Sequence, residues 1–395
     1  MAYTYAIVAI AALICAFIIQ KYTRQSDPGH EGTREKDIEQ DDALKAYQDI
    51  EPLTELDWQS TPPMKLRPFK PKYHLTMGLE NVPLSDLIQM DSTYLDRIKL
   101  RREIMNTHTE ATLACNAVAE DAAMELYTWL VEVYLPKRFP TCFAVVPSAE
   151  QSSHSEKPQT PHRQLLNKIT GETVPLQPTD GLTGLRTLIS HVDTDFLILL
   201  PRQPSPDNND SQEPLQPVYH LEAFATTFPS GFSTRSKLSL PLAAIHGPVP
   251  RYASKIGKSM DRFFARMETG KMVRRANWTI TTTPDLFTQS GTHMSDPDAT
   301  PEQQAEAIAQ QQQDLDISSM RLRTELQTLH RLPVTGALVF AFKTYQYTLE
   351  EVKAEGNGEA LAEATEGFLK GSVPEMEVYK RVAVWGGKVR EYLRS

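Results

Sequence analysis

The sequence predicts an α+β protein in which a sheet is wrapped by helices. Segments that alternate between apolar and polar residues, as strands do, lie between segments whose apolar residues recur at helical spacing. The strand candidates are not adjacent along the chain, which is typical of the mixed class. Apolar residues make up 40% of the 395 residues, which is enough for a large core.

Each element follows from its local pattern. Helical spacing predicts helices at 85–106, 111–135, 254–270, 320–332, 359–371 and 376–393. Prolines are expected to end two of them, at Pro136 and Pro333, and Gly270 a third. Range 184–200 predicts a short helix that leads into a buried strand, and alternation predicts strands at 218–228, 276–283 and 336–349.

Three segments look like surface insertions. Ranges 147–180, 202–217 and 284–318 are rich in Ser, Thr, Gln and Pro or carry a Gln-rich run, and they lack a regular apolar period. We expect loops there, or chain without a fixed structure.

The first residues predict a membrane anchor. Range 3–19 is apolar and uncharged, and Lys21 and Arg24 follow it. We expect a transmembrane signal anchor at 1–20, a polar linker at 21–63 and a folded domain at 64–395. The positive flank predicts a single-pass protein of the endoplasmic reticulum with its C-terminal body in the cytosol. The alternatives are a cleaved signal peptide and a buried helix.

Composition and missing motifs exclude several classes. The net charge is −9 and no basic run occurs, which excludes nucleic acid as a partner. Three cysteines without a CxxC pair make neither a disulfide framework nor a zinc site. The sequence also lacks GxGxxG, GxxxxGK[ST], HExxH and GxSxG, so electrons for any redox reaction would come from a separate protein.

A set of short motifs resembles one family. In order along the chain they are RPFKPKYHLTMGL (67–79), DSTYLDRIKLRR (91–102), LPKRFP (135–140), DTDFLILL (193–200), FPSGF (228–232), IHGPVPRY (245–252), RRANW (274–278), RTELQTLHRLP (323–333) and VYK (378–380). This ordered set resembles the haem-dependent oxidative N-demethylase, alpha-subunit-like proteins over roughly residues 64–394. The resemblance implies a PAS-like antiparallel sheet that holds haem. It also implies oxidation of an amine with O2 and electrons from a separate reductase.

His246 is the candidate axial ligand of the haem iron. It ends an apolar run, and Gly247, Pro248 and Pro250 fix the backbone after it. The alternative is a structural histidine in the core. Guanidinium groups match carboxylates, so the candidate partners of the haem propionates are Arg251, Arg274, Arg275 and Arg323. The rival histidines are His74, His191, His220 and His330; we expect His330 at a helix end or facing solvent, and His220 in the pocket wall or in plain packing.

Asp195 and Glu325 are the candidate catalytic acids, because O2 activation and amine oxidation both need groups that hold or move protons. The alternative for Glu325 is an ion pair with Arg321 or Arg323. The alternative for Asp195 is a helix cap or a hydrogen bond to the backbone.

Two positions depart from the family pattern. Thr194 stands where an acidic residue is common, and Leu326 stands where an arginine is common. A pocket that has lost these charges would bind a larger or less polar substrate than a small cationic amine, or would be inactive.

The function predicted first is that of a haem-dependent oxidoreductase of the monooxygenase type. Its substrate would be a small organic molecule, an amine or a biosynthetic intermediate. A PAS-like haem or ligand-binding protein without turnover is the alternative. A carbohydrate-active membrane enzyme is the third possibility, because it fits the anchor, although a clear metal motif is missing and DTD at 193–195 has only the shape of one. NWT at 277–279 would then be a glycosylation site, whereas we expect it to be buried or cytosolic. The positive flank after the anchor argues against the lumen that such an enzyme would need.

Overall fold

The computed structural model describes residues 41–148, 163–202, 216–294 and 300–395. The chain forms two compact units, one from the described parts of 1–55 and 128–177, and the other from 56–127 and 178–395. The smaller unit holds an antiparallel sheet of β3 (Phe143–Pro147), β4 (Arg163–Asn167) and β5 (Thr173–Pro175), with η3 (Leu130–Tyr134) and α6 (Leu135–Arg138). Within it the Trp129 indole donates to the carbonyl of Tyr47 at 2.9 Å.

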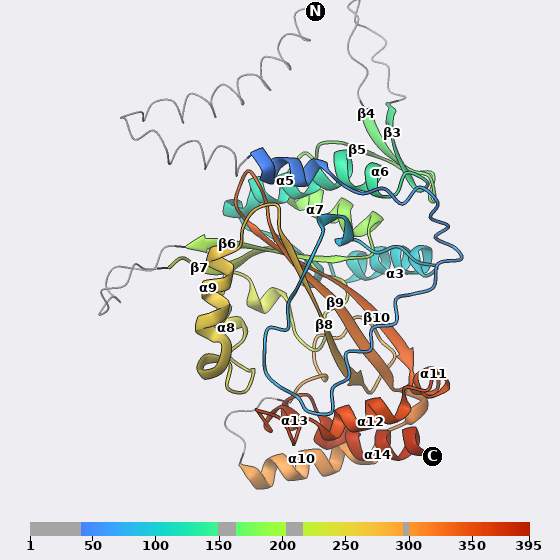
Figure 1. The fold of residues 1–395 in the computed structure, drawn as a ribbon, viewed down its shortest axis with the longest axis vertical. Coiled ribbons are helices and arrows are strands. Elements are labelled where there is room, and N and C mark those ends of the chain that lie inside the picture. The colour runs from blue at the N-terminus through green and yellow to red at the C-terminus, as the bar shows by residue number, and fades with distance from the viewer. Residues whose placement is uncertain (1–40, 149–162, 203–215, 295–299) are drawn as a thin grey trace, which may run out of the picture. The chain divides into compact units, whose positions relative to one another are not determined.

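The larger unit is built on a seven-stranded antiparallel sheet with the order β1-β8-β9-β10-β6-β7-β2. Its strands are β1 (Glu80–Val82), β2 (Leu113–Cys115), β6 (Asp195–Arg202), β7 (Val218–Ala225), β8 (Met272–Thr281), β9 (Arg321–Arg331) and β10 (Leu338–Thr348). In Figure 1 β8, β9 and β10 run side by side as the longest strands of this sheet. The predicted α+β class is therefore confirmed.

Helices surround this sheet (Figure 1). They are α3 (Tyr94–Thr107), α4 (Thr109–Thr112), α5 (Glu120–Trp129, which runs on into the smaller unit), α7 (Gly181–His191), α8 (Leu242–Ile245), α9 (Lys258–Arg266), α10 (Pro301–Gln313), α11 (Leu349–Ala354), α12 (Gly358–Glu366), α13 (Met376–Tyr379) and α14 (Val382–Arg394). Short 3-10 or π turns are η1 (Leu84–Asp86), η2 (Ala117–Ala119), η5 (Arg235–Lys237), η6 (Ala253–Gly257) and η7 (Ile317–Ser319).

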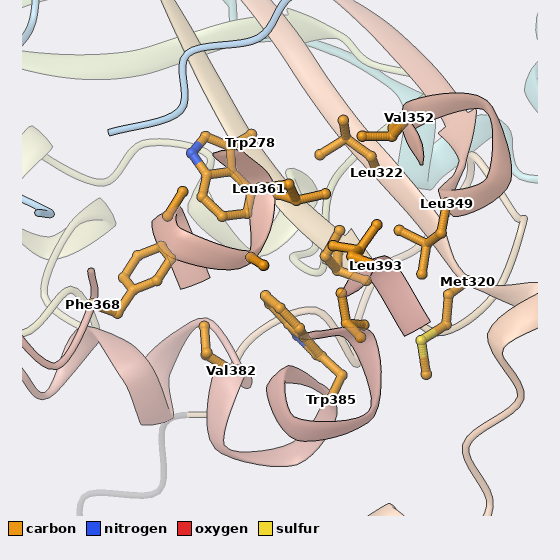
Figure 2. Close-up of a cluster of buried hydrophobic side chains, with 14 of the residues drawn as sticks. Trp278, Met320, Leu322, Leu349, Val352, Leu361, Phe368, Val382, Trp385 and Leu393 are labelled. Carbon is orange, nitrogen blue, oxygen red and sulfur yellow. The ribbon is translucent and has the colours of Figure 1, made fainter. Parts of the chain in front are cut away.

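Side chains alternate along β8 and β9, so the two faces of the sheet differ. One face carries Trp278, Leu322 and Leu326 into a buried apolar cluster with α11, α12 and α14. Figure 2 shows Trp385 and Leu393 of α14 in this cluster, facing the strand residues. This cluster fixes β8 and β9 from one side and leaves their other face for the cavity described below.

The helix–strand pair at 184–200 and the strands at 218–228, 276–283 and 336–349 are confirmed by α7, β6, β7, β8 and β10. The helix predicted at 320–332 is wrong, because β9 occupies that range as an 11-residue strand paired on both edges. Glu, Leu, Gln and Arg favour helices, but pairing with β8 and β10 overrides that preference.

Two other predicted helices are interrupted. Range 111–135 holds the short strand β2 before α5 begins, and Pro136 lies in the first turn of α6 rather than ending a helix. Range 376–393 breaks between α13 and α14 at Arg381, which has a left-handed φ of 58°.

The expected insertions are only partly loops. The first contains β4 and β5, and the third contains α10, which starts with a capping box of Thr300 and Gln303. The segments 149–162, 203–215 and 295–299 lie outside the described residues.

The predicted single-pass membrane protein is contradicted. None of the helices in the described ranges is long and apolar enough to cross a membrane. The apolar range 3–19, on which that prediction rested, lies outside the described residues. The boundaries at 1–20, 21–63 and 64–395 stay predictions.

Candidate functional site

A cavity of about 300 Å³ lies against the sheet in the larger unit, at the lower end of the usual size range of ligand pockets. Most of its wall is apolar. The strands contribute Leu197, Leu199, Leu221, Val273, Leu329, Phe340 and Phe342, and the segments across from them contribute Leu242, Ile245, Tyr252, Ile256, Met260, Phe263 and Phe264. We call the strand residues of this set the apolar field.

Four polar residues lie beside the apolar field, and we call them the polar square. Arg275 on β8 pairs with Gln327 on β9, and Asn277 pairs with Glu325. Residues directly opposite each other on antiparallel strands have Cβ atoms about 5 Å apart. The register of two strands therefore gathers a guanidinium, two amides and a carboxylate on one cavity wall.

Glu325 is held in one orientation. The Gln327 side-chain amide donates to its Oε2 at 2.8 Å. Its Oε1 lies 4.0 Å from the Nε of Arg323, at the outer limit of an ion pair. The ion pair with Arg323, expected as the alternative role of this carboxylate, is thus present at its longest range, and Oε1 keeps lone pairs for a further donor.

Lys380 covers the polar square although it comes from the end of the chain. Its ammonium donates to Asn277 Oδ1 at 3.0 Å and to the carbonyl of Trp278 at 2.7 Å. Burial, with the charge of Arg275, lowers the Lys380 pKa to about 7, while Glu325 acts in the opposite direction. The strained Arg381 follows directly and is tied to Gln311 and to the carbonyl of Gly291.

His246 lines the cavity at the end of α8. Its Nδ1 lies 2.9 Å from the carbonyl of Leu242, and its ring stacks on Tyr252 with centroids 4.9 Å apart. A carbonyl only accepts hydrogen bonds, so Nδ1 carries the proton and Nε2 keeps a lone pair. Burial, aided by the charges of Lys237 and Arg275, lowers the His246 pKa and favours the neutral ring.

His293 is a second cavity histidine that sequence reasoning missed. Its Nδ1 lies 3.1 Å from the Thr292 hydroxyl, and its ring lies 4.7 Å from that of Tyr379. Burial and the charge of Lys380 lower its pKa to about 3, so the ring is neutral at ordinary pH. It lies in the third predicted insertion, where the motifs gave no signal.

The predicted arginines fall in different places. Arg275 lines the cavity, and within the described ranges its guanidinium makes no hydrogen bond or ion pair. Arg251 is 49% exposed and pairs with Glu375, and Arg274 pairs with Glu80 on the surface. Arg323 is buried and donates to the carbonyls of Phe228 and Leu286. The structure therefore brings Arg275 together with His246 and Glu325, and leaves the other three outside the lining.

Asp195 lies in a buried ion network outside the lining. Its carboxylate accepts from Arg101 at 2.6 Å and from the backbone amides of Thr227 and Phe228 at 2.9 and 3.0 Å. Asp193 pairs with the same Arg101, and with Lys343 at 3.3 Å. Both carboxylates of the DTD motif are thus bound by Arg101, Lys343 or backbone amides. The catalytic role of Asp195 stays a prediction.

The rival histidines do not line the cavity. His74 is exposed, and Nδ1 of His220 lies 2.9 Å from the carbonyl of Ser239. His330 is fully buried on β9, so the expectation of a solvent-facing helix end is wrong. His191 is buried at the end of α7.

The two departures from the family pattern also lie away from the cavity. Leu326 points into the apolar cluster on the opposite face of the sheet, and Thr194 is buried outside the lining. Neither residue contacts the space a substrate would fill. The expected change in substrate size therefore does not follow from them.

The family model described as haem-dependent oxidative N-demethylase, alpha subunit-like, matches residues 78–390. This range holds the whole seven-stranded sheet, His246, the polar square and Lys380.

Proposed function

The chain belongs to the haem-dependent oxidative N-demethylase, alpha subunit-like family, and from this premise we propose that the cavity binds haem and oxidises a small organic substrate. The family name indicates haem-dependent chemistry and a role as an oxidoreductase. The observation that carries the proposal is that His246 lines an apolar cavity with Nδ1 held by the carbonyl of Leu242 and Nε2 left unprotonated.

The cavity contains a residue that can serve as the axial ligand of the haem iron. A haem ligand must offer an unprotonated ring nitrogen in a fixed orientation, and a hydrogen bond at the other nitrogen fixes it. His246 meets both needs, because Leu242 holds Nδ1 and Nε2 keeps its lone pair. We propose His246 as the axial ligand.

The residues also fit the porphyrin and its propionates. The apolar field and Tyr252, Met260 and Phe264 supply aliphatic and aromatic walls. The charges of Lys237 and Arg275 both lower the His246 pKa, and both residues line the same cavity. We propose them as propionate partners, with Lys237 added to the arginines predicted from the sequence.

Haem, when bound, supplies the activation of O2, with electrons from a separate reductase. The chain's own groups would do the rest. Glu325, oriented by Gln327, accepts a proton or hydrogen bond from the substrate. The apolar walls exclude water from the cavity, which strengthens that contact.

The PAS-like fold remains part of the proposal. Counted in chain order, the five long strands β6 to β10 lie in the order 2-1-5-4-3, all antiparallel. This arrangement supports a compact sheet that presents one face to a ligand.

The test is the visible spectrum of the full-length chain after loading with haem. We expect a Soret band at one haem per chain that shifts or disappears in His246→Ala. His220→Ala is the control, because that histidine lies outside the lining, and it should leave the band unchanged. A band unaffected by His246→Ala but lost in His293→Ala would move the ligand to the second histidine. Failure of the wild type to bind haem would overturn the proposal, and bound haem that never turns over would favour a binding protein.

A further inference from the structure

The polar square, together with the Lys380 that covers it, has hydrogen-bond donors on one side and an acceptor on the other. The ammonium of Lys380 has three N–H groups, and Asn277 and Trp278 take two of them. The third N–H has no hydrogen-bond acceptor among the described residues, and the ammonium also lies 5.9 Å from the ring of Trp278 and 5.8 Å from that of Phe368. Because an ammonium only donates, Asn277 must turn Oδ1 toward Lys380, which turns its NH2 group away.

This leaves two donors side by side, the third N–H of Lys380 and the Asn277 amide. Neither the amide nitrogen of Asn277 nor the third N–H of Lys380 has an acceptor in the described part of the chain. Lys380 is only 6% exposed, so these donors meet the cavity rather than bulk solvent. Two neighbouring donors, one of them a charged ammonium below about pH 7, match the two oxygens of a carboxylate.

The acceptor half lies directly across the strand pair. Glu325 is the cross-strand partner of Asn277, and Gln327 fixes its Oε2. Its Oε1 lies 4.0 Å from Arg323 Nε but accepts no hydrogen bond among the described residues, so it would accept an N–H from a substrate amine. Cross-strand partners are separated by about 5 Å at Cβ, so the two halves are spaced for a short molecule.

We infer that the polar square binds a substrate that carries both an amine and a carboxylate, that is, an N-methylated amino acid. Glu325 faces the amine, and Lys380 with Asn277 faces the carboxylate. The inference rests on the proposed function for the oxidation itself, but the binding site is built from the chain's own side chains. The carboxylate that these donors bind could belong to the substrate or to a haem propionate, and the test distinguishes the two.

The test is protection of Lys380 from reductive methylation, read by peptide mass spectrometry on the full-length chain without haem. N-methylglycine is expected to slow the labelling of Lys380 about tenfold at saturation, in line with a charge-assisted hydrogen bond, and acetate to slow it less. Dimethylamine, which has no carboxylate, should not protect. N-methylglycine and dimethylamine are secondary amines that consume some of the formaldehyde, so protection of Lys380 is read relative to the labelling of Lys370 on the surface in the same sample.

The Glu325→Gln variant separates the two halves. Acetate should protect Lys380 in it as in the wild type, whereas the advantage of N-methylglycine over acetate should be lost. Thermal unfolding of the variant checks that the fold survives.

Each remaining outcome is decisive. Equal protection by dimethylamine, or no protection by either carboxylate, would overturn the inference. Protection by haem alone, with none by N-methylglycine, would assign these donors to a propionate and also overturn it. Because the labelling needs no haem, a missing Soret band would sink the proposed function without affecting this result.

Discussion

Three acidic residues of the sequence motifs show how surroundings decide the role of a carboxylate. Asp193 and Asp195 are enclosed by Arg101, which comes from α3, about ninety residues earlier in the chain. Glu325 instead accepts an amide N–H at one oxygen, has Arg323 only at 4.0 Å from the other, and lines the cavity. The first two therefore stabilise the fold, and the third is available to a ligand.

Arg101→Met is expected to destabilise the protein by about 3–5 kcal/mol, because it leaves two buried carboxylates without their partner. The matched control is Arg251→Met, which breaks an exposed ion pair with Glu375 and should cost about 0–1 kcal/mol. Urea unfolding at neutral pH measures both. Similar losses in the two variants would show that the buried network contributes no more than a surface pair.

The buried network also makes stability depend on acid. Burial opposes ionisation of Asp193, but Lys343 and Arg101 hold its pKa at about 2, below the ordinary 3.8. A carboxyl with a depressed folded-state pKa contributes stability above its unfolded pKa and loses it as the pH falls through the folded one. The wild type should therefore weaken between about pH 4 and pH 2. The Asp193→Asn variant, less stable at neutral pH, should weaken less in that window in acid-dependent urea unfolding.

Lys380 predicts a pH dependence in the alkaline range. Its pKa is lowered from 10.5 to about 7, so between these values the unfolded chain binds a proton that the folded chain does not. Stability from this group therefore rises as the pH increases through that window. The stability of the wild type relative to Lys380→Met should grow between pH 7 and pH 9 in urea unfolding. A constant difference would mean that Lys380 stays charged in the cavity.

At the scale of elements, β9 explains why the sequence was misread. Its residues suit a helix, and Leu322, Leu326 and Leu329 have nearly helical spacing. The same residues also alternate, with Leu322 and Leu326 toward the apolar cluster and Glu325 and Gln327 toward the cavity. Pairing with β8 and β10 decides between the helical and the strand period, and this pairing exists only in the tertiary structure.

The same limit applies to the site. His246, Arg275 and Glu325 could be found because motifs mark them, and all three line the cavity. Lys380 lies within a motif but gave no sign of its position, since a break between two helices turns it inward. His293 had no motif at all. Residues brought to a site by a loop or a helix break leave no periodic signal.

Gly231 and Thr292 provide a test of how the loop that carries His293 is held. Gly231 has φ +74°, and a Cβ added there would overlap the hydroxyl of Thr292. Gly231→Ala should therefore cost more than the about 1–2 kcal/mol of a left-handed alanine. Gly291→Ala is the control, because Gly291 has φ +81° and open space around its Cβ position. Thermal unfolding compares them, and equal losses would mean that the Thr292 contact yields without strain.

At the scale of the whole molecule, one face of the sheet packs against the C-terminal helices and the other face lines the cavity. The cluster around Trp278 and Trp385 stabilises the C-terminal helices on the first face. On the second face, apolar side chains and Arg275, which makes no hydrogen bond within the described ranges, line a cavity. A cavity of this kind gains contacts when its ligand enters, so ligand binding and stability of the larger unit must be linked.

Haem is therefore expected to raise the unfolding temperature of the full-length chain. A ligand at a hundred times its Kd stabilises the folded state by about 2.7 kcal/mol, because it binds the folded chain and not the unfolded one. The shift should shrink in His246→Ala, which loses the proposed iron ligand, and persist in His220→Ala. Differential scanning calorimetry at several haem concentrations measures it. A shift that is the same in all three proteins would place haem on the protein at some other position, whereas a shift lost only in His246→Ala would tie the stability of the larger unit to the contact between this histidine and the haem.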